Sequence, residues 1–556
     1  MYVRHSIAAI LLLAVGIVHG APAPMGYADA RHLLGRTGFG PTDAEVRTFA
    51  AMTREQAVAT LLRDARSEAI TPPPVWALET GPTGAPRGDN VSAETRKAFQ
   101  QLQIRHGVEL RGWWVQEMLI TPSPLTERMT LFWHNHFVSS QQKVRVARFM
   151  YAQNALLRAN ALGNFGTMLH AVSKDPAMLI YLDTAQSRKG QPNENFAREV
   201  MELFTLGEGH YGEQDIKEAA RAFTGWSVDR ETGRYLFRPG THDYGVKTVL
   251  GKSGNFDGDD VLDILLARPQ AAQFVTAKLW REFVSPDPDA REVARIAQIF
   301  RSQNLEVKVA LRALLLSKAF WAPEHRGTLV KSPVELVVGT LRQLELSPAA
   351  AAPFAISVAG MGQNLMSPPN VKGWPGGEVW INSSTLLARK QFLNRLVRAA
   401  EPPASMSSSL VMTTAPNGGD ANTARTPEGS MIDARPINVA AATPVGAATP
   451  SITSVAAVSP GAIALAPAVT TATAADDDKA RARRAALAVE RSMRDLQFDA
   501  TQWVAHRAGP TPSAKMDAAQ ALLLPLPALT AETLATDVDA TAFMRSTLLD
   551  PAYQLK

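Results

Sequence analysis

The stretch that decides the fold reads ERMTLFWHNHF at residues 127–137 and, further on, NENFAREVMELFTLGEGHYG at residues 193–212. At 100° per residue, the second segment separates an apolar arc from an opposite polar arc. This split predicts an amphipathic helix that leads into a glycine-punctuated connection at residues 207–212. The polar arc consists of Glu194, Asn195, Arg198, Glu199, Glu202 and Thr205.

Helical signals extend through most of the chain. The pairs Thr42/Glu45 and Thr53/Gln56 have the spacing of capping boxes. TPSP at residues 121–124 should end one helix and start the next, because proline fits a first turn but not a helix interior. We therefore expect a mainly α fold, a bundle-like domain of many helices over residues 21–401.

Two short segments depart from helical periodicity. RYLFRPG (234–240) and GVKTVLG (245–251) alternate like strands around THDY, which predicts a small β-hairpin insertion with His242 and Asp243 at its tip. The aspartates of NFDGDD (255–260) suggest helix capping more than calcium binding, since the glutamate at the twelfth loop position is missing.

The C-terminal third is divided by composition. Residues 402–477 form a low-complexity tract of Ala, Thr, Pro, Ser and Val, which predicts a long disordered insertion. A charged helix is expected from Asp477 to Asp499. The helices of residues 478–556, ending in STLLDPAYQLK, are expected to return to the main domain.

The first residues have the layout of a secretory signal, with Arg4 followed by an apolar run and small residues near Gly20. We expect a signal peptide at residues 1–20 and a periplasmic or secreted protein. The chain has no cysteine, so disulfides and lipoprotein anchors are excluded. No later apolar run predicts a transmembrane segment. A net charge of +5 spread over 556 residues does not favour a nucleic-acid partner.

Taken together, six ordered motifs and the terminal STLLDPAYQ resemble the bacterial domain-of-unknown-function family numbered 1800. The resemblance implies an exported, mainly helical protein, often encoded beside a second exported family with a sulfatase-like fold, which would be a candidate partner. It supplies no catalytic residues. The motifs are HLLGRTGFGPT (32–42), LTERMTLFWHNHF (125–137), NENFAREVMELFTLGEGHYG (193–212), EAARAFTGW (218–226), HDYGVKTVLG (242–251) and GWPGGEVWINSSTLLARKQF (373–392).

One hypothesis is a hydrolase or oxidoreductase that depends on a divalent metal. Imidazole and carboxylate groups suit such an ion, and the expected ligands are His134, Glu199, Glu202 and His210. In this hypothesis Arg198 holds an anionic group, and Glu194 or Asp243 serves as general base. His134 and His136 cannot share one metal on a continuous helix, because residues two apart point about 160° away from each other.

The alternative is a non-catalytic protein of the cell envelope that binds a glycan or a partner protein. His136, His242, Trp374, Trp380 and Asn382 are the expected binding residues, since indole rings stack on sugars. The same tryptophans would otherwise plug their loop against the core. GRTGFG at residues 35–40 reads as a turn and not as a phosphate cradle, because the P-loop lysine and a preceding strand are both missing.

Overall fold

The computed structural model describes residues 23–79, 91–229, 231–398, 472–530 and 539–556. Within these ranges, residues 23–398 and 482–556 belong to one compact unit, whereas residues 472–481 belong to a second one. The expected signal peptide lies outside the described residues, as does the expected insertion up to residue 471. The charged helix α21 spans Ala472–Asp495, so it begins and ends a few residues earlier than expected.

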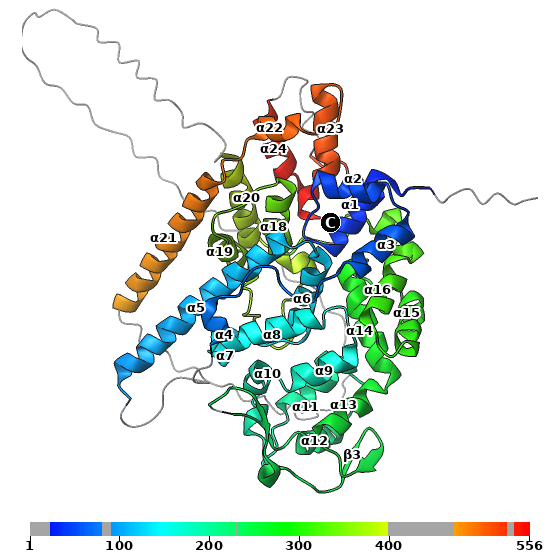
Figure 1. Ribbon diagram of the computed structural model, residues 1–556, viewed down its shortest axis with the longest axis vertical. Coiled ribbons are helices and arrows are strands. Elements are labelled where there is room, and N and C mark those ends of the chain that lie inside the picture. The colour runs from blue at the N-terminus through cyan, green and yellow to red at the C-terminus, as the bar shows by residue number, and fades with distance from the viewer. Residues whose placement is uncertain (1–22, 80–90, 230, 399–471, 531–538) are drawn as a thin grey trace, which may run out of the picture. The chain divides into compact units, whose positions relative to one another are not determined.

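The mainly α fold is confirmed (Figure 1). The N-terminal half contains α1 (Gly26–Thr37), α2 (Asp43–Ala50), α3 (Arg54–Arg63), α4 (Val75–Leu78), α5 (Ala93–Ile120), α6 (Pro124–His136), α7 (Gln141–Val144), α8 (Ala147–Ala159), α9 (Phe165–Ser173), α10 (Pro176–Tyr181), α11 (Asn195–Glu199) and α12 (Glu213–Ala222). The second half contains α13 (Gly258–Leu266), α14 (Pro269–Phe283), α15 (Ala290–Ser302), α16 (Val307–Leu315), α17 (Lys318–Trp321), α18 (Pro333–Gln343), α19 (Ala352–Gly360), α20 (Ser383–Arg398), α22 (Ala500–Ala505), α23 (Pro512–Leu523) and α24 (Ala540–Leu549).

The helix boundaries follow the predicted local signals. Thr42 and Thr53 each accept a hydrogen bond from the backbone three residues on, and both capping boxes are complete. Helix α5 stops at Ile120 and α6 starts at Pro124, as the TPSP motif predicts. Asp257 caps α13 through a further capping box with Asp260, which confirms the capping interpretation of residues 255–260.

Helix α6 is buried on all sides and packs against α1, α5 and α8. Its charged residues are compensated inside the core. Arg158 donates two hydrogen bonds to Glu127, at 2.5 and 2.9 Å, and the Trp114 indole donates a third at 2.8 Å. Arg128 pairs with Glu282 at 2.6 Å and also with Glu335 of α18. A buried ion pair is costly to break from one side, so these pairs fix how α6, α8 and α18 fit together.

The predicted single hairpin is wrong in its pairing. Strand β2 (Tyr235–Phe237) pairs with β1 (Trp226–Val228), and β3 (Lys247–Val249) pairs with β4 (Lys252–Gly254), both antiparallel. The turn between β3 and β4 is formed by Leu250 and Gly251 with φ of 50° and 80°, the left-handed pair typical of a tight two-residue hairpin. His242 and Asp243 therefore lie between two hairpins and not at a tip.

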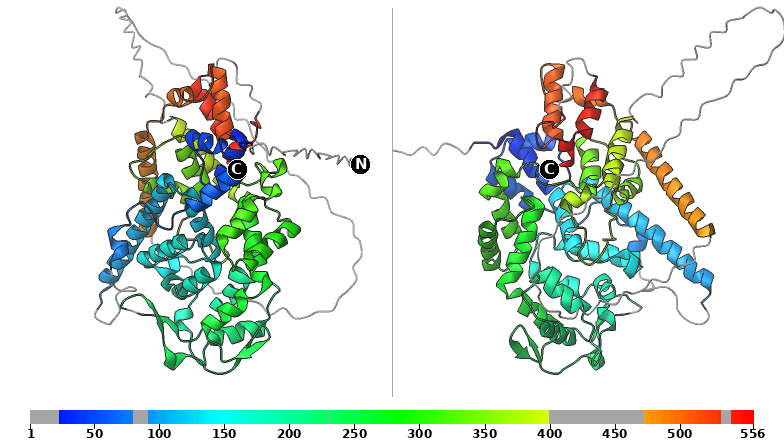
Figure 2. Two further views of the ribbon diagram at one scale, coloured as in Figure 1. Left: turned by 45° about the vertical axis from the view of Figure 1, so that its right-hand side comes forward. Right: turned by 180° about the vertical axis from the view of Figure 1, so that it is seen from behind.

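The C-terminal segment returns to the N-terminal part of the fold. Figures 1 and 2 show α22, α23 and α24 beside the blue α1 and α2 and the yellow-green α18 and α20. The 3₁₀ helix η6 (Pro551–Gln554) follows α24, and Leu555 then forms an antiparallel bridge with Val330. Lys556 continues this pairing by donating its backbone N–H to the Leu329 carbonyl at 2.8 Å.

Candidate functional site

The glycine-rich loop at residues 35–40 is held against helix α18. Gly40 has a φ of +108°, and a Cβ there would lie 2.9 Å from the Cα and the carbonyl oxygen of Gly339. A Cβ on Gly339 would in turn meet the Phe39 carbonyl oxygen at 2.2 Å. Two glycines thus allow the loop backbone and the helix to approach more closely than any side chain would permit. The glycines serve packing, in agreement with the predicted turn.

Helix α18 begins with a capping box that places a carboxylate under this loop. Ser332 accepts a hydrogen bond from the Glu335 backbone, and the Ser332 backbone donates to Glu335 Oε2 at 2.8 Å. The other carboxylate oxygen of Glu335 accepts hydrogen bonds from Arg128 and Lys556. Glu335 therefore joins α6, α18 and the C-terminal residue at one point.

Lys331 precedes this helix and is buried at 8% exposure. Its backbone is fixed at both ends, because Lys331 N–H donates to the Gln554 carbonyl at 2.8 Å and Arg389 donates to the Lys331 carbonyl at 2.9 Å. The ammonium group lies 3.8 Å from the centre of the Tyr553 ring, a cation–π contact. Within the described ranges, the Lys331 ammonium has neither a carboxylate partner nor a hydrogen-bond acceptor.

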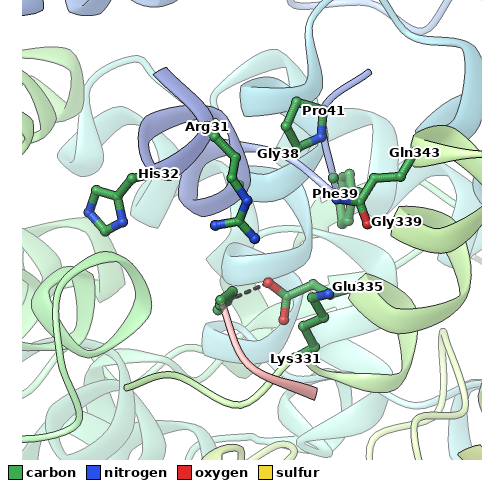
Figure 3. A pocket seen from close by; sticks show the side chains of 12 residues that line it. Arg31, His32, Gly38, Phe39, Pro41, Lys331, Glu335, Gly339 and Gln343 are labelled. Carbon is green, nitrogen blue, oxygen red and sulfur yellow. Dashed lines mark hydrogen bonds and ion pairs between the residues drawn. The ribbon is translucent and has the colours of Figure 1, made fainter. Parts of the chain in front are cut away.

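These elements enclose a small cavity of about 20 Å³. The space is close to that of one water molecule. Figure 3 shows the Arg31 guanidinium, from α1, directed into it toward Glu335, while His32 points away. Arg31 Nε and Nη2 donate to the carbonyls of Leu522 and Leu523, and Nη1 has no partner among the described residues. The lining is Arg31, His32, Gly35, Gly38, Phe39, Gly40, Pro41, Lys331, Glu335, Gly339, Gln343 and Lys556.

Cations outnumber acids in this lining. Among the lining side chains, Arg31, Lys331 and Lys556 carry cationic groups and Glu335 carries the one carboxylate. Burial raises the pKa of Glu335, but Arg128 and Lys556 outweigh that effect and bring the pKa to about 2. Burial lowers the pKa of Lys556 to about 8 and that of Lys331 well below its usual range, with Arg31 adding repulsion at Lys331. An anionic group entering the cavity would favour the charged form of both lysines.

A larger groove of about 320 Å³ lies next to the cavity and shares Arg31 and His32 with it. One wall is the face of α1 around Tyr27 and Arg31. The opposite wall is the face of α23 that carries Asp517, Gln520 and Ala521, at the i, i+3, i+4 spacing of one helix side. The segment from Leu524 to Ala528 completes the wall with mostly apolar side chains.

The structure does not assemble the expected metal ligands. Across the described ranges, no three His, Asp or Glu side chains are grouped so that they could hold a metal ion. His134 is buried in the core, whereas His210 is exposed to solvent. Glu202 instead accepts a hydrogen bond from the Tyr211 hydroxyl at 2.8 Å and lies 3.9 Å from the Lys372 ammonium.

The helix that carries the polar arc also differs from expectation. Helix α11 ends at Glu199 and continues as a π-helix, η2 (Val200–Thr205), not as a regular α-helix. Leu206 N–H bonds the Met201 carbonyl five residues back at 2.8 Å, and the Thr205 hydroxyl donates to the Val200 carbonyl at 2.5 Å. Glu199, the last residue of α11, is half-buried, and burial and then Glu202 raise its pKa.

The two histidines of WHNHF diverge, as expected for a continuous helix. The His134 ring packs edge-on against Trp114, at 5.5 Å between centroids, and its buried Nε2 has no hydrogen-bond partner in the described part of the chain. On the other side, His136 Nε2 lies 3.1 Å from the Phe204 carbonyl, and Lys278 Nζ lies 3.1 Å from Nδ1.

The residues expected to act as acid, base and anion holder are engaged in separate ion pairs. Arg198 contacts Glu194 at 3.5 Å and binds Glu213 of α12 at 2.8 Å. Asp243 accepts hydrogen bonds from Arg221 at 2.8 and 3.3 Å, and Arg221 lowers its pKa to about 2. A carboxylate with so low a pKa is a weak proton acceptor near neutral pH.

All of the expected binding residues except Asn382 are buried. His242 is buried and its Nδ1 lies 2.8 Å from the Thr224 carbonyl. Trp374 and Trp380 are 4% and 6% exposed, so their loop is plugged into the core and the indole faces are covered. Asn382 is exposed and accepts a hydrogen bond from Thr385 N–H at 3.0 Å, which makes it the cap of α20.

A family model described as protein of unknown function (DUF1800) matches residues 32–547, most of the chain. The chain belongs to the DUF1800 family. No curated protein and no solved structure matches this DUF1800 chain. None of the helices in its described part combines the length and the apolar character needed to cross a bilayer.

The cavity of this DUF1800 protein was not among the sites expected from its sequence. The local signals were present, since KSPVE at residues 331–335 is a lysine followed by a capping box with proline at its first helical position. The sequence does not show which distant residues pack beside these local signals. Lys331 and Glu335 form the cavity lining only because the tertiary fold places Tyr553 and Lys556 beside them.

Proposed function

We propose that this protein binds a ligand through an anionic carboxylate group that enters the cavity between α1, α18 and the C-terminal segment. The single observation that carries the proposal is Lys331, a buried lysine that lines the cavity and whose ammonium has no hydrogen-bond acceptor in the described residues. Burying a cation whose only close contact is an aromatic ring is costly, and a carboxylate would reduce that cost.

The cavity offers several donors to such a group. Lys331 Nζ and Arg31 Nη1 have no acceptor among the described residues, and Lys556 Nζ has donors beyond the one given to Glu335. Hydrogen bonds between charged donors and a carboxylate are among the stronger ones in proteins. Binding without turnover is the function that this donor set supports, in line with the non-catalytic alternative.

We also propose that binding takes place outside the cytoplasm. The signal-like residues 1–20 and the lack of cysteine support export. The mature chain, beginning after residue 20, is therefore the form for the binding experiments.

Acetate is a small carboxylate with only one methyl group, so it tests whether the cavity binds the carboxylate group itself. Thermal unfolding of the mature chain is compared in sodium acetate and in sodium chloride of equal ionic strength. We expect acetate to stabilise the wild type more than chloride does, by about 1.4 kcal/mol at ten times its Kd. Lys331→Met should abolish this difference because it removes the ammonium that has no hydrogen-bond acceptor in the described residues.

Lys308→Met is the matched control, since it removes the same charge from an exposed position on α16. It should keep the acetate effect. Each comparison is made within one variant, so a change in basal stability does not obscure it. Equal melting temperatures in acetate and chloride for the wild type, or an undiminished acetate effect in Lys331→Met, would contradict the proposal.

A further inference from the structure

We infer that the ligand is an amphiphilic monocarboxylate, whose carboxylate occupies the inner cavity while its hydrocarbon part lies in the groove between α1 and residues 517–528. The inference rests on the proposed carboxylate site. The cavity is small and lined by several charged side chains, whereas the groove is larger and has a mostly apolar wall. Arg31 and His32 line both spaces. A ligand that uses both spaces needs one anionic end and one apolar end.

The size of the inner cavity selects the anionic group. About 20 Å³ accommodates one water-sized group, such as a carboxylate oxygen. A phosphate or sulfate presents three or more oxygens around a tetrahedral centre, so it needs more space than a planar carboxylate. The glycine-rich loop cannot yield easily, because Gly40 and Gly339 are already in backbone contact. The geometry therefore favours a planar carboxylate.

The wall of the groove selects the remainder of the ligand. Leu524, Pro525, Leu526 and Pro527 present apolar surface, and Ala521 leaves room beside them. Leu526 packs closely against Gly327, where a Cβ would approach its side chain at 2.6 Å. A volume of about 320 Å³ is within the range of small-molecule sites.

The polar residues of the groove are largely occupied already. Arg326 is paired with Asp29, and Tyr27 donates its hydroxyl to Asp43 at 2.7 Å. Asp517, an acid, would repel a second negative charge on the ligand. These features favour a single anionic group followed by an apolar chain over a polyanion or a sugar.

Isothermal titration calorimetry of the mature chain tests the inference with three probes: octanoate, acetate and octyl phosphate. We expect octanoate to bind at least about tenfold more tightly than acetate, because its methylene groups leave water. Octyl phosphate should bind at least about tenfold more weakly than octanoate. Ala521→Trp, which fills the groove, should reduce octanoate affinity to that of acetate and leave acetate affinity unchanged.

Ser513→Trp is the matched control, because Ser513 is exposed on the same helix and does not line the groove. It should bind octanoate like the wild type. Leu526→Asp is a second groove variant and should weaken octanoate in the same way. Circular dichroism verifies that the variants fold.

The outcomes separate the two proposals. If octanoate binds no more tightly than acetate while acetate still binds, the amphiphile inference is overturned and the carboxylate site stands. If octyl phosphate matches octanoate, the selection of a carboxylate is overturned. If no probe binds the wild type, the proposed function fails as well.

Discussion

Asp175 is a carboxylate buried at 4% exposure, at the N-cap of helix α10. It accepts hydrogen bonds from Met178 N–H at 3.2 Å and from the Gln153 amide at 2.9 Å. Burial outweighs these bonds and raises its pKa from 3.8 to about 7. The folded protein therefore holds a proton that the unfolded chain releases above about pH 4.

This proton makes stability depend on pH with a definite sign. The wild type should lose unfolding free energy as the pH rises from about 4 to about 7, by on the order of 3 kcal/mol from this group. Asp175→Asn keeps the cap oxygen and removes the titration, so its stability should lack this component. Urea unfolding of both proteins at pH 5 and pH 8 measures the difference, and parallel losses in both would contradict the assignment.

Single residues were predictable from the sequence where their partners are close in the chain. Thr42 and Thr53 act as caps because the groups they bind are three residues away. The role of Glu335 was not predictable, since Lys556 reaches it from 221 residues further on. The divergence of His134 and His136 followed from helix geometry alone, whereas the failure of His134, Glu202 and His210 to meet is a property of the tertiary fold.

At the scale of elements, His170 links helix α9 to helix α13. Its Nδ1 lies 2.9 Å from Asp259, and its Nε2 lies 2.9 Å from Asp263. The hydrogen bond to Asp259 is the main reason that the pKa of His170 is raised, against burial that lowers it. The contribution to stability is complete below about pH 6.5 and is lost as the pH rises through the raised pKa.

His170→Gln should remove this pH dependence. Because the side chains of the pair are partly exposed, the effect at pH 6 should be at most about 1 kcal/mol. The unfolding free energies of wild type and variant should converge above pH 8. Denaturation at pH 6 and pH 8.5 measures this, with Asp263→Asn as the control that removes one partner only. A constant gap at both pH values would exclude the proposed link.

Sequence periodicity was sufficient to predict some elements and not others. The periodicity of apolar residues located the helices and the stretches that form β2 and β3, because it is a local property of the sequence. It could not choose strand partners, and β1 and β4 came from segments with weak strand signals of their own. The π-helix η2 was also hidden, since residues 193–206 fit the period of an α-helix and the extra residue in the turn depends on how Thr205 and Leu206 bond.

At the scale of the whole molecule, Tyr553 joins α18 to the C-terminal segment. The side chain is fully buried, and its hydroxyl lies 2.8 Å from the Thr340 hydroxyl. Tyr553→Ala should cost about 3–5 kcal/mol of unfolding free energy, because it leaves a cavity in the core. Tyr553→Phe should cost only about 1 kcal/mol, the value of one hydrogen bond.

Tryptophan fluorescence during urea unfolding reports both changes, since several buried tryptophans lie in the same unit. A loss below 1 kcal/mol for Tyr553→Ala would show that the terminal segment is only loosely attached. The mainly α architecture was predictable at this scale from composition and periodicity. The position of the proposed carboxylate site was not, because it depends on the bridge between Val330 and Leu555.

That bridge has a consequence for the order of folding. The two residues that pair there are separated by more than two hundred residues, and closing so long a loop costs entropy before any contact compensates it. A nascent chain would carry Glu335 and Arg128 long before Lys556 is synthesised. Assembly of the pocket should therefore be among the latest and slowest steps of folding. The time at which the proposed ligand begins to bind would measure this step.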